Sequence, residues 1–151
     1  MDQPVPTNTF SRRSTTTLAR FLLGKRLVRT DAAGRVTRHR ITEVEAYHGA
    51  RDRACHACRG QTPRTAVMFA PGGVWYVYLC YGLHEMLNLV TGPAAFPAAV
   101  LIRGVEGIAG PGRVSKALGI DRSLNGRPAA PASGLYVEDD GFRVPRRLIH
   151  A

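Results

Sequence analysis

Short apolar segments, separated by glycine, proline and polar residues, predict several strands and few helices along this chain. One helix is expected at 15–23, where apolar residues recur at helical spacing. Ser14 is placed to cap its first turn, and Gly24 is placed to end its last turn. This helix therefore has a start signal, a stop signal and one apolar face.

Two strand-like segments, 26–30 and 36–47, flank a polar turn at 31–34 and are expected to pair as a hairpin. Its buried positions are expected to include three aliphatic residues, Val36, Ile41 and Val44.

Further strands are expected where β-favouring runs are bounded by turn residues, at 74–80, 85–90, 98–103, 135–138 and 142–144. A short helix is expected at 113–118, and a turn at 81–84. The pattern predicts the α+β class: a single domain with a curved, mainly antiparallel β-sheet flanked by short helices and a protruding β-hairpin. Residues 1–9 are expected to be disordered, and 10–151 to form the domain.

Residues 49–73 are polar, punctuated by glycine and proline, and carry arginines, which is typical of a long functional loop. Val67, Met68 and Phe69 are expected to attach this loop to the core.

The composition favours a polyanionic partner, because 21 basic against 11 acidic residues give a formal charge of +10. Nucleic acid fits best. No apolar run approaches the roughly 20 residues that span a bilayer, so no membrane association is expected. Three cysteines, Cys55, Cys58 and Cys80, without a signal-like start predict a cytoplasmic protein, associated with the nucleoid in a bacterium.

Glu43, Glu45 and Tyr47 alternate along one predicted strand, so their side chains are expected to share a face. An exposed edge of the sheet explains Glu43. We interpret Glu45 as a site residue because a carboxylate there lies beside an aromatic ring.

Tyr81 is expected at the exposed tip of a hairpin, whereas Trp75 and Tyr76 are interpreted as core residues of the preceding strand. Chemistry on a base inside a duplex requires the nucleotide to be extruded, and a side chain inserted into the stack offsets the cost. Tyr81 could be that insert.

Gly110-Pro111-Gly112 ahead of a helix offers backbone amides to a phosphate, with charge added by Arg113 and Lys116. GxSxG, GxGxxG and Walker motifs are absent, which leaves serine-hydrolase and nucleotide-cofactor chemistry unsupported.

Several motifs then occur in a characteristic order: Glu43-Val44-Glu45-Ala46-Tyr47 with His56, Gln61-Thr62-Pro63-Arg64, Val67-Met68-Phe69, Gly72-Gly73, Tyr76-Val77-Tyr78-Leu79-Cys80-Tyr81-Gly82, Asn88, Val100-Leu101-Ile102-Arg103, Gly110-Pro111-Gly112 and Lys116-Ala117-Leu118-Gly119-Ile120. Together they closely resemble the alkyladenine (3-methyladenine) DNA glycosylase family, from about Leu18 to Asp140.

The resemblance implies roles for the matching residues. Glu45 would be the general base that activates the attacking water, and Tyr81 would fill the vacated place in the duplex. The base pocket would comprise Tyr47, His56 and Tyr78 as stacking residues, Asn88 as a gate, and Arg103 beside them. Contacts to DNA would come from Arg64, Gly112, Ser115 and Lys116.

The implied activity is that of a monofunctional DNA glycosylase that removes alkylated or deaminated purines by hydrolysis and leaves an abasic site in base excision repair. The implied partner is double-stranded DNA with a damaged purine, approached from the minor-groove side by a monomer. No metal or cofactor is implied. Strand cleavage would need an amine nucleophile, and neither Lys25 nor Lys116 lies in the pocket segments.

The chain departs from the family pattern at two places. Only residues 104–109 separate Arg103 from the Gly-Pro-Gly turn, where the family has a longer insertion, and the C-terminus at 145–151 is expected to be trimmed. We expect these losses to affect stability and DNA affinity more than chemistry.

Three alternatives remain at this stage. A lesion-binding relative could have lost catalysis through a misplaced Glu45, or a generic arginine-rich nucleic-acid-binding protein could use its tyrosines only as core. A small zinc module could be built on Cys55, His56 and Cys58, completed by Cys80 or His48, although no second ligand pair at zinc spacing is present.

Overall fold

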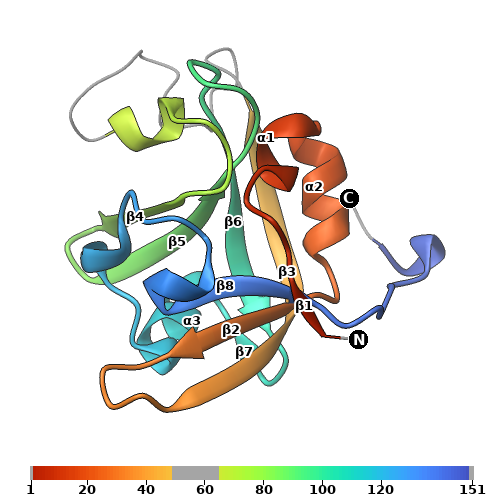
Figure 1. Ribbon diagram of the computed structural model, residues 1–151. Helices are drawn as coiled ribbons and strands as arrows, with labels where there is room; N and C mark the ends of the chain where they lie inside the picture. The colour runs from red at the N-terminus through yellow and green to blue at the C-terminus, as the bar shows by residue number, and fades with distance from the viewer. Residues whose placement is uncertain (1, 49–64, 150–151) are drawn as a thin grey trace.

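The computed structural model describes residues 2–48 and 65–149, which form one curled antiparallel sheet with short helices around it (Figure 1). The strands are β1 (Gln3–Pro4), β2 (Arg26–Thr30), β3 (Val36–His48), β4 (Trp75–Cys80), β5 (His84–Val90), β6 (Ala98–Val105), β7 (Ile108–Ala109) and β8 (Leu135–Asp139). The helices are α1 (Thr9–Arg12), α2 (Thr15–Leu22) and α3 (Pro111–Leu118), with 3₁₀ turns η2 (Ala66–Phe69), η3 (Arg122–Leu124), η4 (Pro131–Ser133) and η5 (Arg146–Leu148). The predicted α+β class is confirmed.

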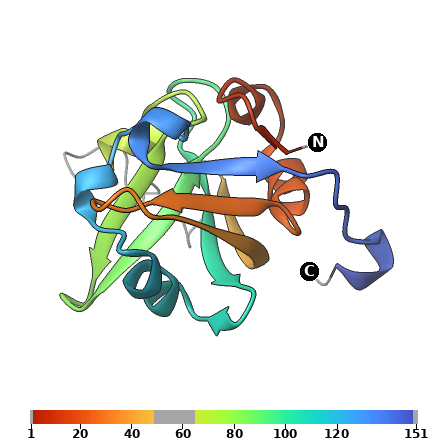
Figure 2. The ribbon, with the colours of Figure 1, turned by 60° about the horizontal axis from the view of Figure 1, so that its bottom comes forward.

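The strands follow the order β1-β8-β2-β3-β6-β5-β4, and β7 pairs with β6. Long β3 joins the two halves, pairing with β2 through its first part and with β6 through its second. Figure 2 shows β2 and β8 running across the direction of β6, which gives the sheet its curl. The main hydrophobic cluster, which includes Trp75, fills the inside of this curl.

The expected helix and hairpin near the N-terminus are both present. The Ser14 hydroxyl accepts a hydrogen bond from the Thr17 amide at 3.2 Å, and α2 ends just before Gly24, whose φ is +86°. Strands β2 and β3 pair as predicted, and Ile41 is buried. Val36 is 48% exposed, contrary to expectation, because it lies beside the turn at the outer end of the hairpin.

The expectation that residues 1–9 are disordered is wrong for the part that the structure describes. Strand β1 pairs with β8, and the Val5 amide donates to the Val137 carbonyl at 2.8 Å. Val5 and Phe10 are buried in the main cluster. Two apolar anchors in a polar, proline-rich segment are therefore enough to order it.

Residues 142–144 do not form the expected strand. The Asp139 and Asp140 side chains accept hydrogen bonds from the amides of Gly141 and Phe142, so the chain turns at the end of β8. Beyond this turn, Phe142 and Val144 line a groove with Leu23 and residues of β3 instead of pairing in a ladder.

The four strands β3-β6-β5-β4 have two different faces. Residues directly opposite one another in a ladder share a face, and alternate residues change face. One face carries Trp75 and Val77 into the main cluster. The other face holds a smaller cluster of Met68, Tyr76 and Val90 under η2, and the predicted site residues of β3 and β4 lie on this face.

Candidate active site

A row of four residues, each paired with the next across neighbouring strands, shows on which face of the sheet the predicted site residues lie. Glu45 on β3 lies opposite Leu101 on β6, which lies opposite Asn88 on β5, which lies opposite Tyr76 on β4. Ladder partners share a face, so the predicted catalytic glutamate and the predicted gating asparagine are on the same side of the sheet.

Both carboxylate oxygens of Glu45 accept hydrogen bonds from side chains. The Tyr47 hydroxyl donates to Oε1, and Arg103 Nη1 donates to Oε2 at 2.7 Å. Glu45 and Arg103 remain 41% and 43% exposed, so the carboxylate is held in place but open to an approaching ligand. We call these three residues the carboxylate corner.

The pKa of Tyr47 is raised from its ordinary value, first because burial disfavours the phenolate and then because its hydroxyl bonds to Glu45. The phenol therefore stays protonated and remains a hydrogen-bond donor to the carboxylate. It cannot serve as a base near neutral pH.

Arg103 lies two residues after Leu101, the ladder partner of Glu45, and therefore on the same face of the sheet, next to an irregularity in the β3–β6 ladder. Glu43 pairs with Gly104, but the next residue, Val44, pairs with Ile102, so Arg103 has no direct partner on β3. Such a bulge redirects the side chain of the extra residue. Glu43 is exposed, as predicted, beside this bulge.

Tyr47 and Tyr78 form an aromatic wall next to the carboxylate. Both are partly buried and pack against the smaller cluster around Met68. The rings of Tyr78 and Tyr76 lie 5.3 Å apart at 39°. Tyr76 is buried, which confirms its interpretation as a core residue, and Val67, Met68 and Phe69 attach the end of the long loop to the core as predicted.

Asn88 is buried, and its amide nitrogen donates to the backbone carbonyls of Tyr76 at 3.3 Å and Met86 at 3.2 Å. These two bonds fix the orientation of the side chain within the sheet. Its role as a gate for the base stays a prediction.

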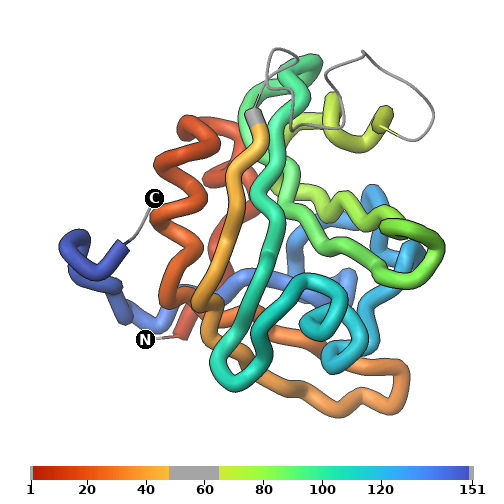
Figure 3. The backbone as a smooth tube through the Cα atoms, turned by 180° about the vertical axis from the view of Figure 1, so that it is seen from behind, coloured from red at the N-terminus to blue at the C-terminus, as the bar shows by residue number. Residues whose placement is uncertain are grey.

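The β4–β5 hairpin presents two apolar side chains to solvent at its tip, which we define as residues 81–83. Tyr81 is 93% exposed and Leu83 is 77% exposed. The φ of Tyr81 is +53°, a left-handed conformation that costs a non-glycine residue roughly 1–2 kcal/mol. Figure 3 shows this hairpin extending from the sheet. Strain in an exposed aromatic residue is typical of a functional position.

Helix α3 lies against β5 and reaches His84, the residue that follows the tip. A Cβ at Gly112 would lie 2.8 Å from His84 Nδ1, so only glycine permits this close approach. Lys116 is exposed. Ser115 is only 1% exposed, and its contact with DNA stays a prediction.

His56 and Arg64 lie outside the described residues, as do Cys55 and Cys58 of the zinc alternative. Among the residues that the structure describes, no group of three potential metal ligands comes together, and Cys80 is a free thiol. Across 2–48 and 65–149, every helix is too short or too polar to cross a membrane.

The geometry thus defines an antiparallel α+β domain with a carboxylate–tyrosine site on one face and an exposed aromatic hairpin tip at its edge. Residues 9–109 match the family model described as methylpurine-DNA glycosylase (MPG). The chain belongs to this family, whose members are DNA glycosylases, hydrolases of N-glycosyl bonds in DNA repair. The resemblance noted from its motifs is confirmed.

Individual relatives agree with this placement. A protein of Psychrobacter cryohalolentis is 48% identical over 85% of this chain and 74% of its own length. One of Anaeromyxobacter dehalogenans is 51% identical over 86% of this chain and 65% of its own, and one of Methanocella arvoryzae is 46% identical over 90% and 78%. All three are named "Putative 3-methyladenine DNA glycosylase". The chain thus spans from just under two thirds to about three quarters of these relatives' lengths.

Proposed function

We propose that this protein is a monofunctional DNA glycosylase that extrudes alkylated or deaminated purines from duplex DNA and hydrolyses the N-glycosidic bond. The observation that supports this most directly is the carboxylate corner. Glu45 is oriented through both oxygens, stays accessible, and stands beside the aromatic wall of Tyr47 and Tyr78.

The reaction needs what this arrangement supplies. As the bond from C1′ to the purine nitrogen breaks, its electron pair leaves with the base and positive charge develops on the sugar. A fixed carboxylate stabilises that charge and orients a water molecule toward C1′. Glu45 takes the proton of the attacking water and then loses it to solvent. An alkylated purine leaves as a neutral base, whereas a deaminated purine leaves as an anion that takes a proton from water; the other product is an abasic site. Alkylation at a ring nitrogen makes the purine a better leaving group.

The hairpin tip would supply the space for this chemistry. Inserting Tyr81 into the duplex offsets the loss of stacking when the damaged nucleotide leaves, which costs a few kcal/mol. The extruded purine would then stack on Tyr47 and Tyr78, with Asn88 and Arg103 at the edges of the pocket.

The absence of strand cleavage is proposed from the positions of the two lysines. Lys25 is buried and paired with Asp139, and Lys116 lies on α3. Neither belongs to the carboxylate corner or the aromatic wall, so neither lysine presents an amine for a Schiff base with the sugar.

The remaining features of the proposal concern the setting of the reaction. A wedge inserted beside the extruded nucleotide is expected to act from the minor-groove side. The formal charge of +10 supports association with DNA, and hence with the nucleoid in a bacterial cell. We propose that the protein acts as a monomer.

The test is incubation with duplexes that contain 3-methyladenine, 7-methylguanine, hypoxanthine or ethenoadenine, followed by alkaline cleavage at abasic sites. We expect base release from at least one substrate and no strand cleavage without alkali. Binding without base release would favour a catalytically impaired relative. Equal binding of damaged and undamaged duplex without base release would favour a generic nucleic-acid-binding protein.

A further inference from the structure

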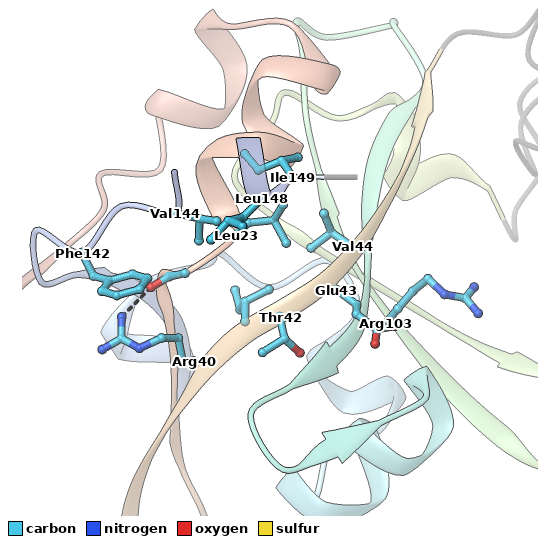
Figure 4. Close-up of a pocket in the computed structure, with 12 residues that line it drawn as sticks. Leu23, Arg40, Thr42, Glu43, Val44, Arg103, Phe142, Val144, Leu148 and Ile149 are labelled. Atoms are coloured by element: carbon cyan, nitrogen blue, oxygen red, sulfur yellow. Dashed lines mark hydrogen bonds between the residues drawn. The ribbon is translucent and has the colours of Figure 1, made fainter. Parts of the chain in front are cut away.

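A groove of about 560 Å³ lies between β3 and the C-terminal segment, which we define as residues 140–149 (Figure 4). Its walls are mostly apolar and include Leu23, Val44, Phe142, Val144, Leu148 and Ile149. Arg103 also lines this groove, and the same side chain donates to Glu45. The groove and the carboxylate corner therefore share one bordering residue, Arg103 on β6.

This segment is held to the sheet although it forms no strand. Buried Lys25 donates to the Phe142 carbonyl at 2.7 Å and pairs with Asp139 at 3.2 Å. Arg40 pairs with Asp140 at 2.8 Å, and its guanidinium lies 4.5 Å from the centre of the Phe142 ring. These contacts give the segment a defined place.

Two arginines on this segment have no structural task. Arg146 and Arg147 lie in η5, both are exposed, and neither makes an ion pair within the described ranges. Leu148 and Ile149, which follow them, line the groove. Ile149 is partly buried there, whereas Leu148 is still 56% exposed, and both arginines lie in solvent.

Figure 3 shows the C-terminal segment and the β4–β5 hairpin on opposite sides of β3 and β6. DNA held by Tyr81 and presented to Glu45 therefore has a flank that extends toward η5. We propose that Arg146 and Arg147 bind phosphates of this flank, so that the duplex is held on both sides of the extruded nucleotide. This inference rests on the proposed function, and guanidinium groups suit phosphate oxygens.

The test compares R146A/R147A with a matched control, R35A/R127A, which removes the same charge from two exposed arginines outside this segment. Affinity for an undamaged duplex is measured between 50 and 200 mM salt. Losing two phosphate contacts lowers the salt slope by about 1.8, so the affinity ratio between these salts shrinks about tenfold. The control pair is expected to change the slope less. Equal slopes in wild type and R146A/R147A would overturn the proposal.

Binding of duplexes that carry one central lesion, truncated on one side or the other of that lesion, locates the contact. The effect of R146A/R147A is expected to vanish on one truncated duplex and persist on the other; persistence on both would contradict a flank-specific contact. If R146A/R147A keeps the wild-type salt slope but binds polyglutamate more weakly than wild type, the proposal is overturned, and the two arginines bind an acidic protein and not DNA.

Base release separates this inference from the proposed function. R146A/R147A is expected to keep the wild-type single-turnover rate at saturating enzyme, since neither residue touches the reacting atoms. Failure of the wild-type protein to release any base would sink the proposed function, whereas the salt slopes would still decide the role of η5.

Discussion

The carboxylate corner and the hairpin tip belong to the same sheet but differ in how they are held. Glu45 is fixed by donors on its own strand and on β6, and Tyr47 packs on a buried cluster. Tyr81 packs on almost nothing, and its backbone is in a left-handed conformation. Packing and hydrogen bonds hold the carboxylate corner in place, whereas the hairpin tip is exposed and its backbone conformation is locally unfavourable.

This difference fits two different tasks. A group that stabilises charge at one sugar atom must be in place before the substrate arrives. If the side chain had to move during the reaction, the free energy of that movement would offset the stabilisation of the transition state. A side chain that enters a foreign base stack must be free of its own protein until then. Substitutions in the corner should therefore lower the chemical rate, and substitutions at the tip should impair extrusion of the base.

The largest effect is expected for Glu45→Gln, which keeps the size of the side chain but removes its charge and its ability to take a proton. General base catalysis contributes about 10²–10⁴-fold, and a loss in that range is expected in single-turnover base release. Affinity for the damaged duplex should stay near wild type. Activity equal to wild type would exclude Glu45 as the base.

A smaller loss, on the order of 10- to 100-fold, is expected for Tyr81→Ala on duplex DNA, because the variant cannot offset a few kcal/mol of unstacking. The same variant should lose much less on single-stranded DNA carrying the same lesion, where no stack has to be opened. Tyr81→Phe keeps the ring and is the matched control. An equal loss on both substrates would place Tyr81 in the chemistry instead of the extrusion step.

The corner and the tip were also unequally visible in the sequence. Alternation along β3 places Glu45 and Tyr47 on one face, and a tyrosine beside a glycine between two strands marks the tip. The contact with Arg103 could not be foreseen, because it depends on the register between two strands whose contacting residues lie 58 positions apart. Local patterns carry no register between distant strands.

The two errors about local structure have different origins. Residues 1–9 are polar in composition, but Val5 and Phe10 find partners that only the folded sheet provides. The strand expected at 142–144 fails because aspartate side chains turn the chain at the end of β8. The first error thus reflects tertiary contacts, and the second reflects local hydrogen bonds between residues two positions apart.

Tyr47→Phe tests how much the hydrogen bond from Tyr47 to Glu45 contributes to the carboxylate corner. It keeps the stacking surface but removes one donor to Glu45, and we expect about a tenfold loss of the chemical rate, the size of one hydrogen bond to a charged group. Because the pKa of Tyr47 is raised above the ordinary 10.0, its phenol should ionise late in an alkaline absorbance titration. That late component should be absent from the variant. Stability that the protonated phenol contributes is complete below pH 10.0 and declines above it.

The smallest effect concerns stability at the tip. Glycine adopts the +53° φ of position 81 without strain, whereas alanine retains most of the strain of tyrosine. In denaturant unfolding, Tyr81→Gly should therefore be more stable than Tyr81→Ala by about 1 kcal/mol. Both variants should be equally poor at extruding the base, since both lack the ring. If Tyr81→Gly is the less stable of the two, the tip is not strained in solution. If the two also differ in base release, backbone conformation and not the aromatic ring governs insertion.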